Sequence, residues 1–170
     1  MKEKLLSIIV VFQLSVFHEK HQTETTNEFV VFTKSRKTII GENKNGNLKI
    51  YHDLDSVSVK ILGLIKDYKV GKKVTTVEFK NQLTNSYQFK NDTFILVDSL
   101  GVYQLETKLK PIVLLIQSPK INLERLIEKM QPKQIIADAS NYKNQVLKWR
   151  YICDKNGIPF YYCRKRSNYF

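Results

Sequence analysis

Residues 111–163 read PIVLLIQSPKINLERLIEKMQPKQIIADASNYKNQVLKWRYICDKNGIPFYYC, a stretch in which short apolar runs alternate with longer segments of helical periodicity. Ile112–Ile116 and Gln134–Asp138 have the length of strands, and their apolar character is typical of strands that helices cover on both faces. Ile158–Cys163 is a third run of strand length. This alternation predicts a parallel βαβαβ unit with right-handed crossovers.

Two helices are predicted between these strands. The first begins at Asn122, whose side chain can cap free N–H groups, and ends before Pro132. Its apolar stripe consists of Leu123, Leu126, Ile127 and Met130. The second is capped by Ser140 or Asn141 and closes at Gly157. Its apolar face comprises Tyr142, Val146, Trp149 and Cys153.

The first half of the chain has a different pattern, in which β-branched and aromatic runs follow one another directly. Glu28–Lys34, Lys37–Gly41 and Leu48–Tyr51 are predicted as strands of an antiparallel meander. The Asn45-Gly46 pair between the last two tolerates the positive φ of a tight turn. A short helix follows, with apolar residues at helical spacing: Ile61, Leu64, Ile65 and Tyr68.

Two further strands are predicted before the parallel unit, at Val74–Phe79 and Thr93–Asp98. The second is followed by Ser99–Gly101 and a new apolar run from Val102, which predicts a hairpin. The expected fold class is therefore α/β, with a mixed sheet that is antiparallel in the N-terminal half and parallel in the C-terminal half, and helices packed on it.

The N-terminal segment Leu5–Phe17, LLSIIVVFQLSVF, is an apolar run preceded by Lys2 and Lys4. Thirteen helical residues reach only about 20 Å, against about 30 Å of bilayer hydrocarbon, so a complete transmembrane helix is not expected. A secretory signal is a second interpretation, although no pair of small residues for cleavage follows the run. A buried strand or helix of the folded domain is a third.

A polar segment, His18–Asn27, separates this apolar run from the first predicted strand and has no periodicity, as in a linker. The chain is therefore divided into residues 1–25, an apolar stub with its linker, and residues 26–170, one folded domain of ordinary size.

The chain is basic, with 28 Lys and Arg against 16 Asp and Glu. Residues 111–170 alone hold 11 basic and 4 acidic side chains. Such an excess favours a polyanionic partner, because neutralising phosphates releases counterions, although solubility alone also explains a basic surface. The candidate DNA contacts are Arg125, Lys143, Lys148, Arg150, Arg164, Lys165 and Arg166, with Tyr161, Tyr162 and Tyr169 as stacking surfaces.

Motifs of catalysis are missing from the sequence. It contains no HxHxDH, no HExxH, no nucleophile elbow and no phosphate-binding glycine loop. Its three histidines are His18, His21 and His52, all in the first third of the chain. Cys153 and Cys163 lack the close spacing of a structural zinc site, and are predicted as buried thiols or, in an oxidising compartment, as a disulfide. No metal or other cofactor is predicted.

Two polar segments follow predicted parallel strands, Gln117–Leu123 and Asp138–Tyr142. Both come after the carboxyl end of a strand, which is where the sites of α/β sheets usually form. Helix capping explains the same residue types, because Ser, Asn and Asp satisfy the free N–H groups of helix starts. Both interpretations are open from the sequence.

The same segments carry a resemblance to a known family. The run from Val113 to Ser167 closely resembles the C-terminal end of ComEC-type DNA-internalisation competence proteins. The motifs within it are Ser-Pro-Lys-Ile-Asn-Leu, with Ser118, Pro119 and Asn122, and Asp-Ala-Ser-Asn-Tyr, with Asp138, Ser140 and Asn141. The FILVDS segment ending at Asp98 and Ser99, and EFVVFTKSRKTIIG, resemble the start of the same domain, so the similarity extends from about Glu28 to the end.

This resemblance implies a degenerate metallo-β-lactamase-like domain over residues 26–170, and implies that residues 1–25 are an apolar membrane-helix remnant with its linker. Members with a live metal centre carry ligands after the strand that matches Phe94–Asp98, and a pair of histidines where Gln117 and Ser118 stand here. Asp98 and Asp138 remain as possible ligand relics, but two carboxylates without imidazoles make a poor zinc site. The resemblance therefore favours a domain without enzymatic activity.

The function implied is that of a non-catalytic accessory domain in DNA uptake and transformation, contacting single-stranded DNA or the channel. The alternatives are a metal-dependent phosphodiesterase acting on the incoming DNA, and a purely structural or functionless fragment. The implied partners are single-stranded DNA, a membrane channel region, and the bacterial inner membrane through residues 5–17. Lys2 and Lys4 before the apolar run favour a domain on the outer, periplasmic face.

Overall fold

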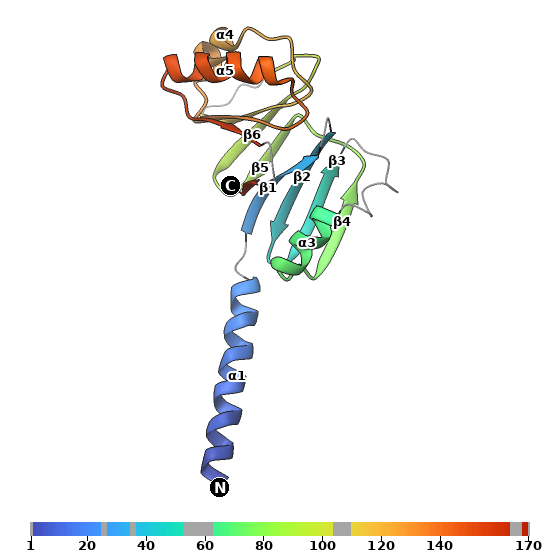
Figure 1. Ribbon diagram of the computed structural model, residues 1–170, viewed down its shortest axis with the longest axis vertical. Coiled ribbons are helices and arrows are strands. Elements are labelled where there is room, and N and C mark those ends of the chain that lie inside the picture. The colour runs from blue at the N-terminus through green and yellow to red at the C-terminus, as the bar shows by residue number, and fades with distance from the viewer. Residues whose placement is uncertain are drawn as a thin grey trace.

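The computed structural model describes residues 2–24, 27–34, 37–52, 63–103, 110–163 and 168–169. Its strands form two five-stranded sheets, and helices cover the outer face of each (Figure 1). The predicted α/β class, with antiparallel strands early and parallel strands late, is confirmed. The strands that were expected in one mixed sheet are divided between two, both of them mixed.

The first sheet has the strand order β10-β1-β2-β3-β4. Its members are β10 (Asn168–Tyr169), β1 (Asn27–Lys34), β2 (Lys37–Lys44), β3 (Asn47–His52) and β4 (Thr76–Lys80). β1, β2 and β3 are antiparallel, which confirms the meander, while β4 lies parallel to β3. Asn45 and Gly46 turn between β2 and β3 with φ of 53° and 80°, the positive values that this residue pair predicted.

The second sheet has the strand order β5-β6-β7-β8-β9. Its members are β5 (Ser86–Phe89), β6 (Asp92–Val97), β7 (Ile112–Leu115), β8 (Gln134–Ala137) and β9 (Phe160–Tyr162). The last four strands are mutually parallel, with α4 (Leu123–Met130) and α5 (Lys143–Lys155) as the crossovers between β7 and β9. The predicted βαβαβ unit is confirmed.

The hairpin predicted through Ser99–Gly101 is wrong, because β6 has other strands on both sides. β6 pairs antiparallel with β5 and parallel with β7. β5 escaped prediction because it is short and only two of its four residues are apolar, but Tyr87 and Phe89 do alternate with exposed residues, as expected of a half-buried strand.

The helix ends agree with the prediction at α4 and at the C-terminus of α5, where Gly157 follows the C-cap Asn156 with φ of 65°, and differ at the start of α5. Asn122 caps α4, since its Oδ1 accepts from the backbone N–H of Arg125 at 3.0 Å. Neither Ser140 nor Asn141 caps α5. The N-cap is Tyr142, and it makes no side-chain cap hydrogen bond. The prediction was wrong because the side chains of Ser140 and Asn141 bond to Asp138 in their own loop and to the backbone of Gln117 and Ser118.

Three apolar clusters hold the layers together. The first lies between the two sheets and includes Phe29 of β1, whose ring stacks on Phe94 of β6 with centroids 3.9 Å apart. The second lies between the second sheet and helices α4 and α5, around Trp149. The third lies between the first sheet and α3 (Gly63–Gly71), around Ile65 and Tyr68. The order of layers is thus helix, sheet, sheet, helices.

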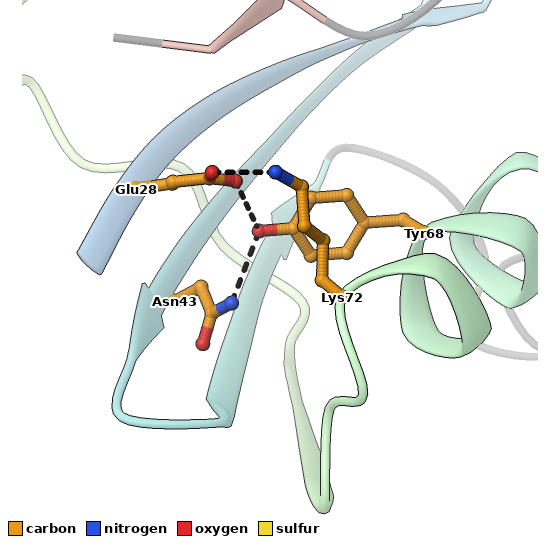
Figure 2. Close-up of polar contacts among 4 residues, drawn as sticks. All are labelled: Glu28, Asn43, Tyr68 and Lys72. Carbon is orange, nitrogen blue, oxygen red and sulfur yellow. Dashed lines mark hydrogen bonds and ion pairs between the residues drawn. The ribbon is translucent and has the colours of Figure 1, made fainter. Parts of the chain in front are cut away.

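Polar contacts also attach α3 to the first sheet (Figure 2). The Tyr68 hydroxyl donates to Glu28 Oε2 at 3.1 Å and accepts from Asn43 Nδ2, also at 3.1 Å. Lys72 pairs with Glu28 Oε1 at 2.7 Å. Since Glu28 and Asn43 belong to β1 and β2, this group of four fixes the helix across two strands.

The N-terminal helix α1 (Lys2–Glu24) extends away from the sheets (Figure 1). It continues through residues 18–24, so the linker predicted there is wrong, because helix propagation costs little once a helix has formed and Glu, Lys and Gln favour it. Side chains 7–18 are exposed, which excludes the interpretation of this run as part of the domain core. Within the part of the chain that is described, no helix is both long and apolar enough to cross a membrane.

Candidate functional site at the carboxyl end of the second sheet

The two motif segments and Asp98 meet where the parallel strands β6, β7 and β8 end. The ladder continues one step past each strand: Ile116 N donates to Val97 O at 3.0 Å, and Asp138 N to Leu115 O at 3.2 Å. The loops that begin at Asp98, Gln117 and Asp138 therefore leave the sheet side by side. The sequence prediction that these segments share one end of the sheet is confirmed.

Asp138 is the centre of this region and is fully buried. Its Oδ2 accepts from Thr38 Oγ1 of β2 at 2.8 Å, which joins the second sheet to the first. Its Oδ1 accepts from Ser140 N and Asn141 Nδ2, both at 3.0 Å, and from the Ser140 hydroxyl. These donors satisfy the hydrogen-bonding capacity of the buried side chain, so Asp138 links the loop after β8 to the first sheet.

Gln117 and Ser118 occupy the positions where the resemblance implied histidines. Both adopt the left-handed conformation, with φ of 55° and 53°. Their backbone N–H groups donate to Ser140 Oγ at 2.7 Å and to Asn141 Oδ1 at 2.8 Å. The Ser118 hydroxyl accepts from the N–H of Tyr142 at 2.7 Å, so one loop supports the start of the next helix.

Asn141 closes the arrangement from the other side. Its Nδ2 donates to Leu115 O at 2.6 Å and to Asp138 O at 3.1 Å, besides the contact with the Asp138 carboxylate. Only 6% of the residue is exposed. The polar atoms of Asn141, Ser140 and Asp138 are thus directed at one another and at neighbouring backbone, which uses the donors and acceptors that a ligand would otherwise meet.

Asp98 is the second possible ligand relic, and it organises a turn. Its Oδ1 accepts from Leu100 N at 2.9 Å and its backbone oxygen from Gly101 N at 2.9 Å. The turn presents Leu100 to solvent with 80% of its surface exposed. Among the described residues, no group of three His, Cys, Asp or Glu side chains could hold a metal ion.

The histidines lie elsewhere. His18 is on α1, as is the backbone of His21. His52 is buried on β3, and its ring meets Phe79 edge-on with centroids 6.4 Å apart. Phe79 packs on the cluster under α3, so this imidazole lies on the α3 side of the first sheet, away from the carboxyl end of the second.

Cys153 and Cys163 are both free and buried, which confirms the thiol interpretation. Cys153 packs under α5 and Cys163 packs between the two sheets, so the second sheet separates them. Burial, with a smaller contribution from the Asp154 charge, raises the pKa of the Cys153 thiol to about 12. A thiol with that pKa is protonated and unreactive at neutral pH.

The predicted DNA contacts are spread along the outer helices. Lys143 and Lys148 are exposed on α5, and the guanidinium of Arg150 lies over the Phe160 ring of β9 at 5.8 Å from its centroid. Arg125 lies on the opposite side of the helix pair, beside the segment after β6. Pro119 follows Ser118 in the β7–α4 connection. Arg164, Lys165 and Arg166 lie outside the described residues.

One feature was missed from the sequence: a cleft of about 310 Å³ between α4 and the segment after β6. It is lined by Gly101, Val102, Tyr103, Arg125 and Lys129, and is named the charged cleft below. The spacing of Arg125 and Lys129, four residues apart on a predicted helix, was a signal available from the sequence.

Two mixed sheets packed face to face, with helices on both outer faces and a hydrogen-bonded carboxyl end, define a four-layered α/β domain. This layer order is consistent with the metallo-β-lactamase-like fold that the resemblance implied. The family model of the ComEC C-terminal domain matches residues 29–170, and the chain belongs to this family. Membership confirms the resemblance and connects the chain with competence and DNA uptake. No curated protein and no solved structure gave a significant match.

Proposed function

We propose that this chain is a non-catalytic accessory domain of DNA uptake that holds single-stranded DNA beside a membrane channel. The observation that carries the proposal is the closed carboxyl end of the second sheet. Asp138, Ser140 and Asn141 bond to each other and to the backbone of Gln117 and Ser118, so the groups that would bind metal or substrate serve the fold instead.

The charge of the chain supports the choice of ligand. The formal net charge is +12, and the helices α4 and α5 place Arg125, Lys143 and Lys148 on the outer layer. Phosphates of single-stranded DNA suit such a layer, because their neutralisation releases counterions with no requirement for a base sequence.

The proposal also assigns α1 to the membrane. Ile8, Ile9, Val10 and Val11 are consecutive, exposed and apolar, and four consecutive residues span most of a helix circumference. A groove on a partner protein would cover only one side of the helix, whereas lipid can contact the helix on all sides. The apolar run would attach the domain to the inner membrane beside its channel partner, with the domain on the outer face, as Lys2 and Lys4 favour.

Binding and hydrolysis of DNA by the purified full chain test this function. A labelled 20-nucleotide oligo-dT is titrated by fluorescence anisotropy at several salt concentrations, and the same oligonucleotide is incubated with protein and Zn²⁺, Mn²⁺ or Mg²⁺. We expect binding that weakens steeply with salt, and an intact oligonucleotide. Stoichiometric metal in the purified protein, together with cleavage of the oligonucleotide, would instead establish a phosphodiesterase. Binding that does not depend on salt would show that the protein does not contact the DNA phosphates.

A further inference from the structure

The charged cleft lies beside the carboxyl end of the second sheet, and its lining residue Gly101 donates its N–H to the Asp98 backbone oxygen there. Its volume of about 310 Å³ is at the lower end of the range of small-ligand sites. One wall is the flank of α4 with Arg125 and Lys129, and the other is the segment Gly101–Tyr103. In Figure 1 the layer of α4 and α5 is at the opposite end of the molecule from α1.

The cationic wall arises from the order of charges along α4, LERLIEKM. Arg125 and Lys129 are four residues apart and therefore lie one above the other. A glutamate directly precedes each of these two residues in the sequence. Because successive residues of a helix are about 100° apart around its axis, the glutamates lie on the side of α4 that faces α5. Glu124 accordingly meets Lys155 of α5 at 3.8 Å. Among the described residues, no ion pair joins Arg125 or Lys129 to a carboxylate, and both side chains line the cleft.

The opposite wall is fixed before any ligand binds. Gly101 has φ of 67°, and a Cβ at this position would lie 3.1 Å from Ile121 Cγ2, so the turn is held closely against the β7–α4 connection. Tyr103 is partly buried, because it packs against the apolar cluster under α4 and α5. An aromatic ring that packing already restricts loses less entropy than a free ring when a base stacks on it.

We propose that the charged cleft binds one nucleotide of single-stranded DNA, with its phosphate on Arg125 and Lys129 and its base against Tyr103. Guanidinium groups bind phosphate oxygens in pairs, and aromatic rings stack with every base, so the site recognises single strands without reading sequence. This inference rests on the proposed function and names the part of the basic surface that performs it.

The test compares variants of the full chain in the oligo-dT titration. In R125A/K129A the loss of the one phosphate contact lowers the magnitude of the slope of log K against log salt by about 0.7, and affinity at low salt falls about tenfold. In Tyr103→Leu, which keeps apolar packing and removes the ring, affinity falls about tenfold while the salt slope stays unchanged. Thermal melts confirm that each variant is folded.

The matched control is K66A/K69A, which removes two exposed cations from α3 on the other outer layer. We expect this control to bind as the unchanged protein does. Equal losses in control and cleft variants, or none in the cleft variants, would overturn the inference while the proposed function stands. An unchanged protein that does not bind the oligonucleotide would remove the proposed function itself. Losses confined to binding of phosphatidylglycerol vesicles would assign the cleft to lipid head groups and overturn the inference.

Discussion

At the residue scale, Asp138 is a motif residue whose hydrogen bonds hold the fold together. Thr38 lies one hundred positions earlier in the chain and donates to its Oδ2 at 2.8 Å across the interface of the two sheets. The sequence identified Asp138 through its motif, but the distant Thr38 carries no motif and became visible only when the sheets were packed together. A residue's partners across a sheet interface depend on the whole topology, and local patterns do not encode them.

Replacing Thr38 with Val removes that donor at nearly constant volume. Because Asp138 is fully buried, a lost hydrogen bond to its carboxyl oxygen should lower the free energy of unfolding by about 1 to 3 kcal/mol. Urea denaturation followed by circular dichroism measures the change. Thr76→Val, which removes an exposed hydroxyl that donates to Asn47 Oδ1, is the control for losing a hydrogen bond in contact with water and should shift stability by less than about 0.5 kcal/mol. Equal unfolding free energies of T38V and the unchanged protein would show that the hydrogen bond between Thr38 and Asp138 does not stabilise the fold.

The buried Cys153 thiol gives a second prediction, which concerns pH. Its pKa is raised to about 12 in the folded protein from an ordinary value of 9.0, so above pH 9 the unfolded chain binds fewer protons than the folded one. This contribution to stability is complete below pH 9 and is lost as pH rises toward 12, by up to about 1.4 kcal/mol per pH unit. Unfolding free energies of the unchanged protein and Cys153→Ala, measured at pH 8 to 10.5, should therefore converge as pH rises. Parallel curves would contradict a raised thiol pKa.

At the scale of elements, local sequence was sufficient for most elements that are organised by their own residues, although it missed β5 and the last turns of α1. The strands of the βαβαβ unit, the Asn45-Gly46 turn and the Asn122 cap were all predicted, since apolar period, turn chemistry and capping are local properties. The start of α5 was not, because the N–H of Tyr142 bonds to Ser118, twenty-four positions earlier. A hydrogen bond to an acceptor in another loop cannot be predicted from the residues at the start of the helix.

Ser118→Ala tests this long-range support. Removing the hydroxyl leaves the Tyr142 N–H without its acceptor at the start of α5, and we expect a loss of about 1 kcal/mol in unfolding free energy. Amide hydrogen exchange should increase selectively in the first turn of α5. Ser99→Ala is the matched control, since that hydroxyl is exposed and makes only a 3.5 Å contact with Gln117. Comparable effects of the two substitutions would show that Ser118 has no special role.

At the scale of the whole molecule, the family match covers the two sheets and the outer helices but begins at residue 29, so α1 lies outside it. The sequence predicted the class of the domain, yet not its division into two stacked sheets, because apolar strands of either sheet look alike until their partners are known. Phe29 and Phe94, stacked between the sheets, are sixty-five positions apart. The aromatic content that fills this interface was visible in the sequence, but its assignment to one interface was not.

The exposed apolar surface of α1 leads to a prediction about the whole chain. Removing residues 1–24 should leave the domain folded, because the side chains of residues 7–18 are exposed and contribute no core. The same deletion should abolish flotation with vesicles of phosphatidylethanolamine and phosphatidylglycerol in 0.5 M salt, where screening over about 4 Å suppresses attraction of the basic domain to lipid. In the full chain, Phe12→Asp with Val16→Asp is the control that keeps α1 but places charge on its apolar surface, and it should float poorly. If the shortened chain still floats at high salt, lipid contact belongs to the domain itself, and α1 is not the membrane attachment.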